Sequence, residues 1–188
     1  MRRPSSPLAA ICLTAVALSP SRDLPLWPFS ASRAWAEGAR VEAVSSSKAL
    51  PLALDDAYEV EKVFSVLIDP VLNGPVGSPW LKAEEERRYF GAVNDFERRQ
   101  RDGHSYAIHW KVSPARSGPL TVRFEYRQQK LGSKVQALES RYPNASGKLR
   151  TEFTIQGDEY HQDGAVTAWR VLLIDQGRVV GLQQSFLW

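Results

Sequence analysis

The sequence contains one cysteine, one methionine and three histidines among 188 residues, and these scarcities narrow the available chemistry. Cys12 has no partner for an intramolecular disulfide, and a lone cysteine cannot build a cysteine-ligated zinc site. A glycine-rich phosphate loop, a G-x-S-x-G nucleophile motif and an H-E-x-x-H zinc motif are also missing. No run of about 18 apolar residues occurs, which argues against an ordinary membrane-spanning helix. Packing must therefore supply the stability of the fold.

The first 36 residues have the features of a secretory signal peptide. Arg2 and Arg3 precede an apolar run from Pro7 to Leu18, and a stretch rich in proline and serine follows. A positive segment, a short apolar segment and a small-residue cleavage site are typical of export signals. Cleavage after Ala36 removes the whole stretch and is preferred, with cleavage after Ala17 as the alternative. We therefore expect an exported protein, periplasmic or extracellular, with no transmembrane span in the mature chain.

Removal of residues 1–36 changes the charge balance. The whole chain has 24 basic and 21 acidic side chains, a formal net charge of +3. Four of the arginines and one of the aspartates lie in residues 1–36, which leaves 20 side chains of each sign. A neutral mature chain lacks the excess positive charge that nucleic-acid binding requires, so we expect no nucleic-acid partner. The only cysteine leaves with the same segment, which excludes a cysteine nucleophile.

From residue 104 onward, apolar and polar residues alternate with a period of two, which is typical of β-strands buried on one face. The apolar faces of the first two strands are formed by Tyr106, Ile108, Trp110, Val112, Leu120, Val122, Phe124 and Tyr126. In the second strand the opposite, polar face is formed by Thr121, Arg123, Glu125 and Arg127. Residues 134–142 predict a weaker strand near a sheet edge, 143–147 predict a turn, and 149–155 alternate cleanly again.

The last 23 residues predict a closing β-hairpin around Asp175, Gln176 and Gly177. Gly177 is expected in the left-handed position of a short loop with a bulge. Apolar residues on both sides of the turn can share one face: Trp169, Val171, Leu173, Val180, Leu182 and Phe186. We therefore expect Trp169, Phe186 and Trp188 to belong to the core.

Residues 37–103 are expected to form an N-terminal strand or strands, a loop and a short helix packed on a sandwich made by residues 104–188. Residues 56–69 are compatible with helix or strand. Strand is preferred because Tyr58, Val60, Lys62 and Phe64 alternate. The order of Ser78 as cap and Pro79 at the first helical position predicts a helix near 79–90.

The run EFTIQGDEYHQDGAVTAWRVLLIDQGRVV resembles the E-strand, corner, F-strand and G-strand of immunoglobulin-like and fibronectin type III-like modules. Trp110 lies where such folds bury a tryptophan, and the resemblance covers roughly residues 104–188. It implies an all-β fold, an antiparallel β-sandwich with one short helical segment near 79–90. The cysteine pair of true immunoglobulin domains is absent. Because such folds host unrelated functions, the resemblance implies no activity.

An arginine-rich segment begins in the last part of the predicted helix and continues beyond it. Its candidate ligand-binding residues are Arg87, Arg88, Arg98, Arg99 and Arg101. Guanidinium groups bind phosphate and carboxylate bidentately, so this segment could hold phosphate, lipopolysaccharide or an acidic glycan. A plainer interpretation is a solvated helical surface neutralised by the glutamates at 84–86.

Residues 158–164 form the densest group of hard metal ligands in the sequence. Asp158, His161 and Asp163 are the candidate ligands, because carboxylate oxygens and one imidazole can bind a divalent cation. The spacing does not match an EF-hand, and a solvated corner whose aspartates cap the turn is the alternative. No cofactor is expected.

These observations favour an exported, non-enzymatic binding or interaction module whose partner is a protein or glycan of the cell envelope. One alternative is a carbohydrate-active or metal-dependent enzyme with a site built from residues 158–163 and 87–104. Another is a structural or assembly component of the envelope that adds its last strand to a partner's sheet. A binding module should expose an aromatic or arginine-lined patch, whereas an enzyme should bring titratable groups together in a pocket. The oligomeric state stays open.

Overall fold

The computed structural model describes residues 41–44, 49–69 and 79–188, all within the compact unit Ala34–Trp188. The predicted signal peptide with both cleavage sites, and the predicted helix cap Ser78, lie outside the described residues.

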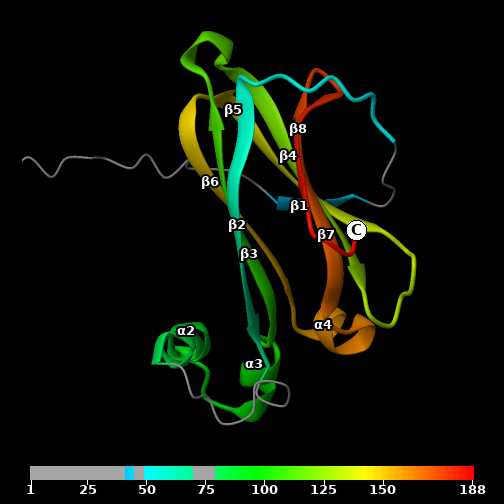
Figure 1. Ribbon diagram of the computed structural model, residues 1–188. Coiled ribbons are helices and arrows are strands. Elements are labelled where there is room, and N and C mark those ends of the chain that lie inside the picture. Colours follow the sequence, from blue (N-terminus) through cyan, green and yellow to red (C-terminus); the bar gives the residue numbers. More distant parts are fainter. Residues whose placement is uncertain (1–40, 45–48, 70–78) are drawn as a thin grey trace, which may run out of the picture. The chain divides into compact units, whose positions relative to one another are not determined.

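The described residues form two antiparallel sheets (Figure 1), which confirms the predicted all-β fold and is compatible with a β-sandwich. The strands are β1 (Val41–Val44), β2 (Tyr58–Ile68), β3 (Gly103–Val112), β4 (Gly118–Gln128), β5 (Gln136–Ala145), β6 (Gly147–Gln156), β7 (Val166–Asp175) and β8 (Arg178–Gln184). One sheet has the order β1-β5-β4-β7-β8 and the other the order β2-β3-β6. The larger of the two apolar clusters in the described residues takes side chains from both sheets and forms the main core.

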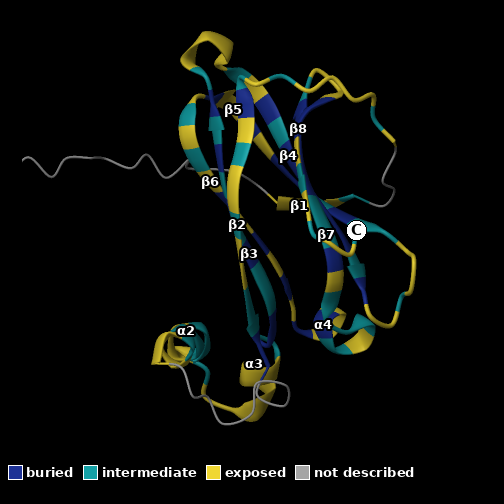
Figure 2. Ribbon diagram, in the orientation of Figure 1, coloured by how far each residue is buried: buried dark blue, intermediate teal, exposed yellow. Residues whose placement is uncertain are grey.

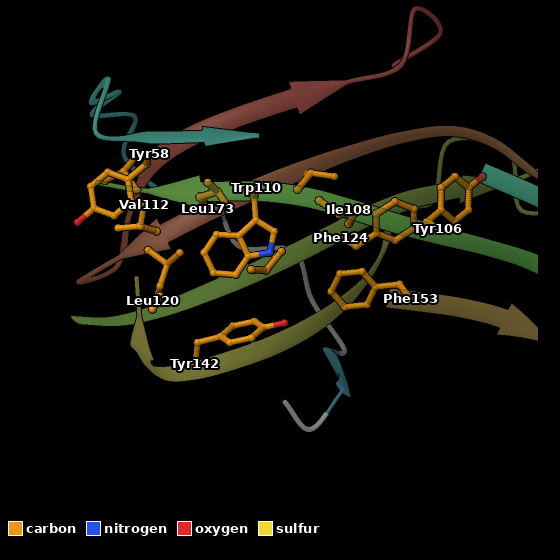
Figure 3. Close-up of a cluster of buried hydrophobic side chains, with 14 of the residues drawn as sticks. Tyr58, Tyr106, Ile108, Trp110, Val112, Leu120, Phe124, Tyr142, Phe153 and Leu173 are labelled. Atoms are coloured by element: carbon orange, nitrogen blue, oxygen red, sulfur yellow. The ribbon is translucent and has the colours of Figure 1, made fainter. Parts of the chain in front are cut away.

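The period-two pattern predicted the core faces of β3 and β4 correctly. The apolar faces of β3 and β4 are buried, and Figure 3 shows Trp110 beside Tyr142 within this core. Trp110 is completely buried, and its Nε1 donates a hydrogen bond of 2.9 Å to Thr151 Oγ1. Because a buried indole N–H needs an acceptor, Thr151 makes this position suitable for tryptophan.

Three α-helices accompany the sheets in the described residues: α2 (Pro79–Tyr89), α3 (Asp95–Arg99) and α4 (Asp158–Asp163). The first confirms the predicted helix, and the other two were not predicted. Residues 158–163 form a helix rather than a loop, with Gly157 and Gly164 at positive φ on either side. Glycine tolerates these backbone angles, so the chain can turn sharply into and out of a single helical turn. No described helix has the length and apolarity to cross a bilayer.

Residues 58–68 are a strand, as preferred, but a β-bulge interrupts their alternation. The register with β3 shifts between Val60 and Lys62. A bulge adds one residue and exchanges the faces of the residues that follow it. Tyr58 is therefore buried, whereas Phe64, expected on the same face, is 45% exposed.

The two expectations for residues 134–147 have different outcomes. The strand β5 lies near an edge as expected, since only β1 separates it from the edge of its sheet. The turn is shorter than 143–147, because β5 continues to Ala145 and β6 begins at Gly147. Gly147 has φ of 69°, which allows a reversal with one residue between the strands.

The closing hairpin is confirmed, but its turn and its end differ from expectation. Gln176 and Gly177 both have positive φ, which is typical of a two-residue turn. The bulge lies farther along the hairpin, where Val180 of β8 is the extra residue between the Leu173–Gly181 and Ile174–Val179 pairs. Trp169 packs against the core. Phe186 and Trp188 are not core residues: β8 ends at Gln184, Phe186 is fully exposed, and Trp188 is half-buried.

Candidate functional site

The outer face of the three-stranded sheet forms a groove of about 570 Å³ beside α2, here called the sheet groove. Its lining comes from four elements: Glu84, Arg87 and Arg88 of α2; Phe64 and Val66 of β2; Ser105, Ala107 and His109 of β3; and Arg150, Glu152, Thr154 and Gln156 of β6. Helix α2 itself buries no residue, and α2 and α3 are mostly exposed or half-buried (Figure 2). A ligand in the solvent can therefore reach the groove.

Strand register brings the polar residues of the sheet groove together in rows. His109 is paired with Lys62 on one side and Arg150 on the other. In the next row, Ala107 lies between Phe64 and Glu152. The Phe64 ring meets His109 edge-on at 5.4 Å, and Lys62 Nζ lies 4.3 Å from the centre of the Phe64 ring.

Arg88 reaches from α2 onto the sheet. Its Nη2 donates to Ser105 Oγ, and its Nη1 lies 3.4 Å from the Gly103 carbonyl oxygen. Ser105 Oγ in turn shares a 3.2 Å hydrogen bond with Thr154 Oγ1. Burial lowers the pKa of Arg88, since desolvation disfavours its charged form. The Arg88 side chain thus docks α2 and places a half-buried guanidinium in the groove.

A second hollow of about 720 Å³, here called the helix pocket, lies among α2, α3 and α4. Two tyrosine–aspartate pairs line it. Tyr160 Oη donates to Asp69 Oδ2 at 2.6 Å, and Tyr89 Oη donates to Asp102 Oδ1. Burial and these hydrogen bonds raise the pKa of both tyrosines. Both phenols therefore stay protonated and act as donors to the two buried carboxylates.

His161 closes the helix pocket opposite Asp102. Its Nε2 lies 3.0 Å from the Arg99 carbonyl oxygen and 3.3 Å from Asp102 Oδ2. A carbonyl oxygen only accepts, so Nε2 must carry the hydrogen. With the hydrogen on Nε2, Nδ1 is the acceptor nitrogen of the neutral ring. The Arg99 carbonyl oxygen thus holds the ring through one nitrogen, with the Asp102 carboxylate nearby, and leaves the other nitrogen for proton transfer.

The five predicted arginines are divided among three places. Arg87 and Arg88 line the sheet groove, whereas Arg98 and Arg99 line the helix pocket. Arg101 donates to the carbonyl oxygens of Arg88 and Phe90 and so fastens the end of α2. The structure does not gather these side chains into one patch.

The three predicted metal ligands have separate partners. Asp158 accepts a 3.0 Å hydrogen bond from Gln100, Asp163 accepts one of 3.4 Å from Gln136, and His161 faces Asp102. Within residues 41–44, 49–69 and 79–188, no three or more His, Cys, Asp or Glu side chains are grouped to hold a metal.

Sequence reasoning did not single out Phe64 and Arg150 in the groove, or Asp69 and Tyr160 in the pocket. The alternation of residues 149–155 did place Arg150 on the polar face. No signal in the sequence indicated that it would lie beside His109, because strands β3 and β6 are paired across about 40 residues.

The chain matches no family model, no curated protein and no solved structure. The two hollows and their side chains are therefore the basis for a functional assignment.

Proposed function

We propose that the protein is an exported, non-enzymatic binding module that holds a glycan of the cell envelope in the sheet groove. The observation that carries this proposal is an exposed aromatic ring, Phe64, within a polar groove outside the core. Export rests on the predicted signal peptide. The immunoglobulin-like or fibronectin type III-like character of the sandwich is part of the same proposal.

The β-bulge in β2 supports a binding role for Phe64. Without the shift between Val60 and Lys62, Phe64 would point to the core face like Tyr58. Bulges often change the direction of a side chain beside a functional site. A phenylalanine that points out of the core lacks the stabilisation that burial would give it. A ligand that covers the Phe64 ring would bury the ring and provide that stabilisation.

A saccharide fits the chemistry of this surface. A sugar ring has an apolar face of C–H groups and a rim of hydroxyls, so it stacks on an aromatic ring while its rim forms hydrogen bonds. Phe64 offers the flat apolar surface, and His109, Glu152 and Thr154 offer donors and acceptors on the neighbouring strands. Such a mixture of one apolar contact and several placed polar groups is typical of small-molecule sites.

A glycan array probed with the full chain tests the proposal. We expect at least one envelope-type glycan to bind, and Phe64→Ala to weaken it by about tenfold through the lost stacking surface. Phe186→Ala is the matched control, because Phe186 is fully exposed and does not line the groove. The proposal fails if no glycan binds, or if Phe64→Ala binds as well as the control.

One observation favours a second function, an enzyme. The helix pocket joins residues 158–163 to the segment 87–104, and it presents the Asp102–His161 pair described above. His161 Nδ1 could accept a proton from water or a substrate hydroxyl as a general base. Incubation of the full chain with each glycan that the array selects tests this. Product formation that His161→Gln abolishes and Phe186→Ala preserves would replace the binding module by a hydrolase.

A further inference from the structure

The charges in the sheet groove indicate the chemistry of its ligand, provided that the proposed function holds. Three guanidinium groups and two carboxylates line the groove. Arg87 pairs with Glu84 at 2.6 Å, and Arg150 pairs with Glu152. Among the described residues, Arg88 contacts only a hydroxyl and a carbonyl oxygen, so no carboxylate neutralises it directly. Among the lining side chains, one positive charge is therefore in excess, and it lies at Arg88; Lys62, beside the Phe64 ring, adds a further positive charge next to the groove.

The excess charge at Arg88 is half-buried, which makes it costly without a counter-ion. A guanidinium that loses water without gaining an anionic partner is left with an uncompensated desolvation penalty. Arg88 has five N–H donors, of which Ser105 and Gly103 take two. The other three donors have no hydrogen-bond acceptor among the described residues, and two of them are enough for a bidentate contact with an anion.

Arg88 is also held in place before any ligand arrives. Ser105 Oγ accepts its Nη2–H and is itself joined to Thr154 on the next strand. The fork therefore rests on two strands of a rigid sheet rather than on a flexible loop. Fixing a binding group in advance lowers the entropy that binding must otherwise lose.

We infer that the glycan held in the sheet groove is acidic, and that Arg88 seats one carboxylate of a uronic or sialic acid residue. A carboxylate carries one charge and so balances the single charge of Arg88, whereas a phosphate monoester carries about 1.5 to 2. The planar carboxylate also matches the planar guanidinium fork. The ring that bears the carboxylate then stacks on Phe64 or its neighbouring groove surface.

Matched pairs of ligands test the inference. An array prints acidic oligosaccharides next to their carboxyl-reduced forms, in which CH₂OH replaces COO⁻, together with sulfated and phosphorylated glycans. Affinities of the full chain for each pair are then measured by titration calorimetry. We expect the acid to bind about 10- to 100-fold more tightly than its reduced form, the range of a bidentate charged contact.

Four variants distinguish an anion-binding role of Arg88 from a role in anchoring α2. Arg88→Gln should abolish the preference for the acid, and Arg88→Lys should lower it because the fork is lost. Arg116→Gln is the matched control, since Asp55 pairs with Arg116 at 3.4 Å and Arg116 does not line the groove. If Arg88 only anchors α2, Arg88→Gln and Ser105→Ala would lower the thermal midpoint but leave the ratio of acid to reduced ligand unchanged.

The outcomes are distinguishable. Equal binding of acid and reduced forms, still dependent on Phe64, overturns the inference and leaves the proposed function standing. A preference for the acid that survives in Arg88→Gln, or binding limited to sulfated or phosphorylated glycans, overturns the assignment of the carboxylate to Arg88. Binding of no glycan overturns both proposals.

Discussion

The strongest test of the fold concerns charges on the face of the five-stranded sheet opposite the core. Arg123, on β4, donates to Glu139 on β5 through Nε at 2.7 Å and lies 3.7 Å from Glu125. Glu125 in turn accepts a 2.5 Å hydrogen bond from Arg170 Nε on β7. Glu125 is only 1% exposed. We therefore expect Glu125→Gln to destabilise the protein, because Arg170 would lose its only close carboxylate among the described residues.

The size of the effect follows from burial. Breaking a buried ion pair by removing one partner costs roughly 3–5 kcal/mol. The Arg170 side chain is 34% exposed and stacks 4.6 Å from the Trp188 ring, so it can regain some water and keep a cation–π contact. The lower end, about 3 kcal/mol, is therefore expected. For a chain of this length this corresponds to a fall of roughly 6–12 °C in Tm.

Urea unfolding followed by circular dichroism measures this change. Glu59→Gln is the matched control, because the Glu59–Lys111 pair is just as short, at 2.7 Å, but exposed, and should show little loss. The double variant Glu125→Met with Arg170→Met should recover much of the stability, since apolar side chains can replace a buried pair. If Glu125→Gln loses no more than Glu59→Gln, water reaches the network and the reasoning is refuted.

Two further predictions concern single side chains. Burial, and secondarily the charge of Arg88, lowers the pKa of His104 to about 4. Between pH 6.5 and 4, His104 therefore binds a proton in the unfolded chain but not in the folded chain. The free energy of unfolding should fall by about 1–3 kcal/mol as the pH drops through this window. In His104→Gln, urea unfolding at the same pH values should show a smaller fall. Trp188→Ala should cost about 1 kcal/mol through loss of its stacking on Arg127 and Arg170. Phe186→Ala should cost almost nothing, and equal losses in the two variants would contradict the placement of Trp188.

Much of the fold could be predicted because period-two alternation states which side of a strand is buried. It identified Trp110, Phe124 and Phe153 as core residues, and all three are fully buried. The alternation misled wherever one residue shifted the pattern. At Val60 the bulge exchanged the two faces, so Phe64 left the core and became part of the groove.

The candidate site was harder to predict because it depends on which strands are neighbours. The five arginines were close in sequence, yet α2 and α3 send them to different hollows. Conversely, His109 and Arg150 are distant in sequence but paired in register. Local pattern carries no information on such pairing, since the register is set by the whole sheet.

The same dependence on register applies to the charged face of β4. Alternation alone places Arg123 and Glu125 on a polar face, which suggests solvent. In a central strand, however, both faces can be covered, and charged residues then persist only with partners across the strands. The sequence shows that Glu139 and Arg170 are charged but not that they lie opposite Arg123 and Glu125. Strand register also places Lys62, His109 and Arg150 side by side next to the groove. The stability and the candidate function of this protein therefore both depend on strand register.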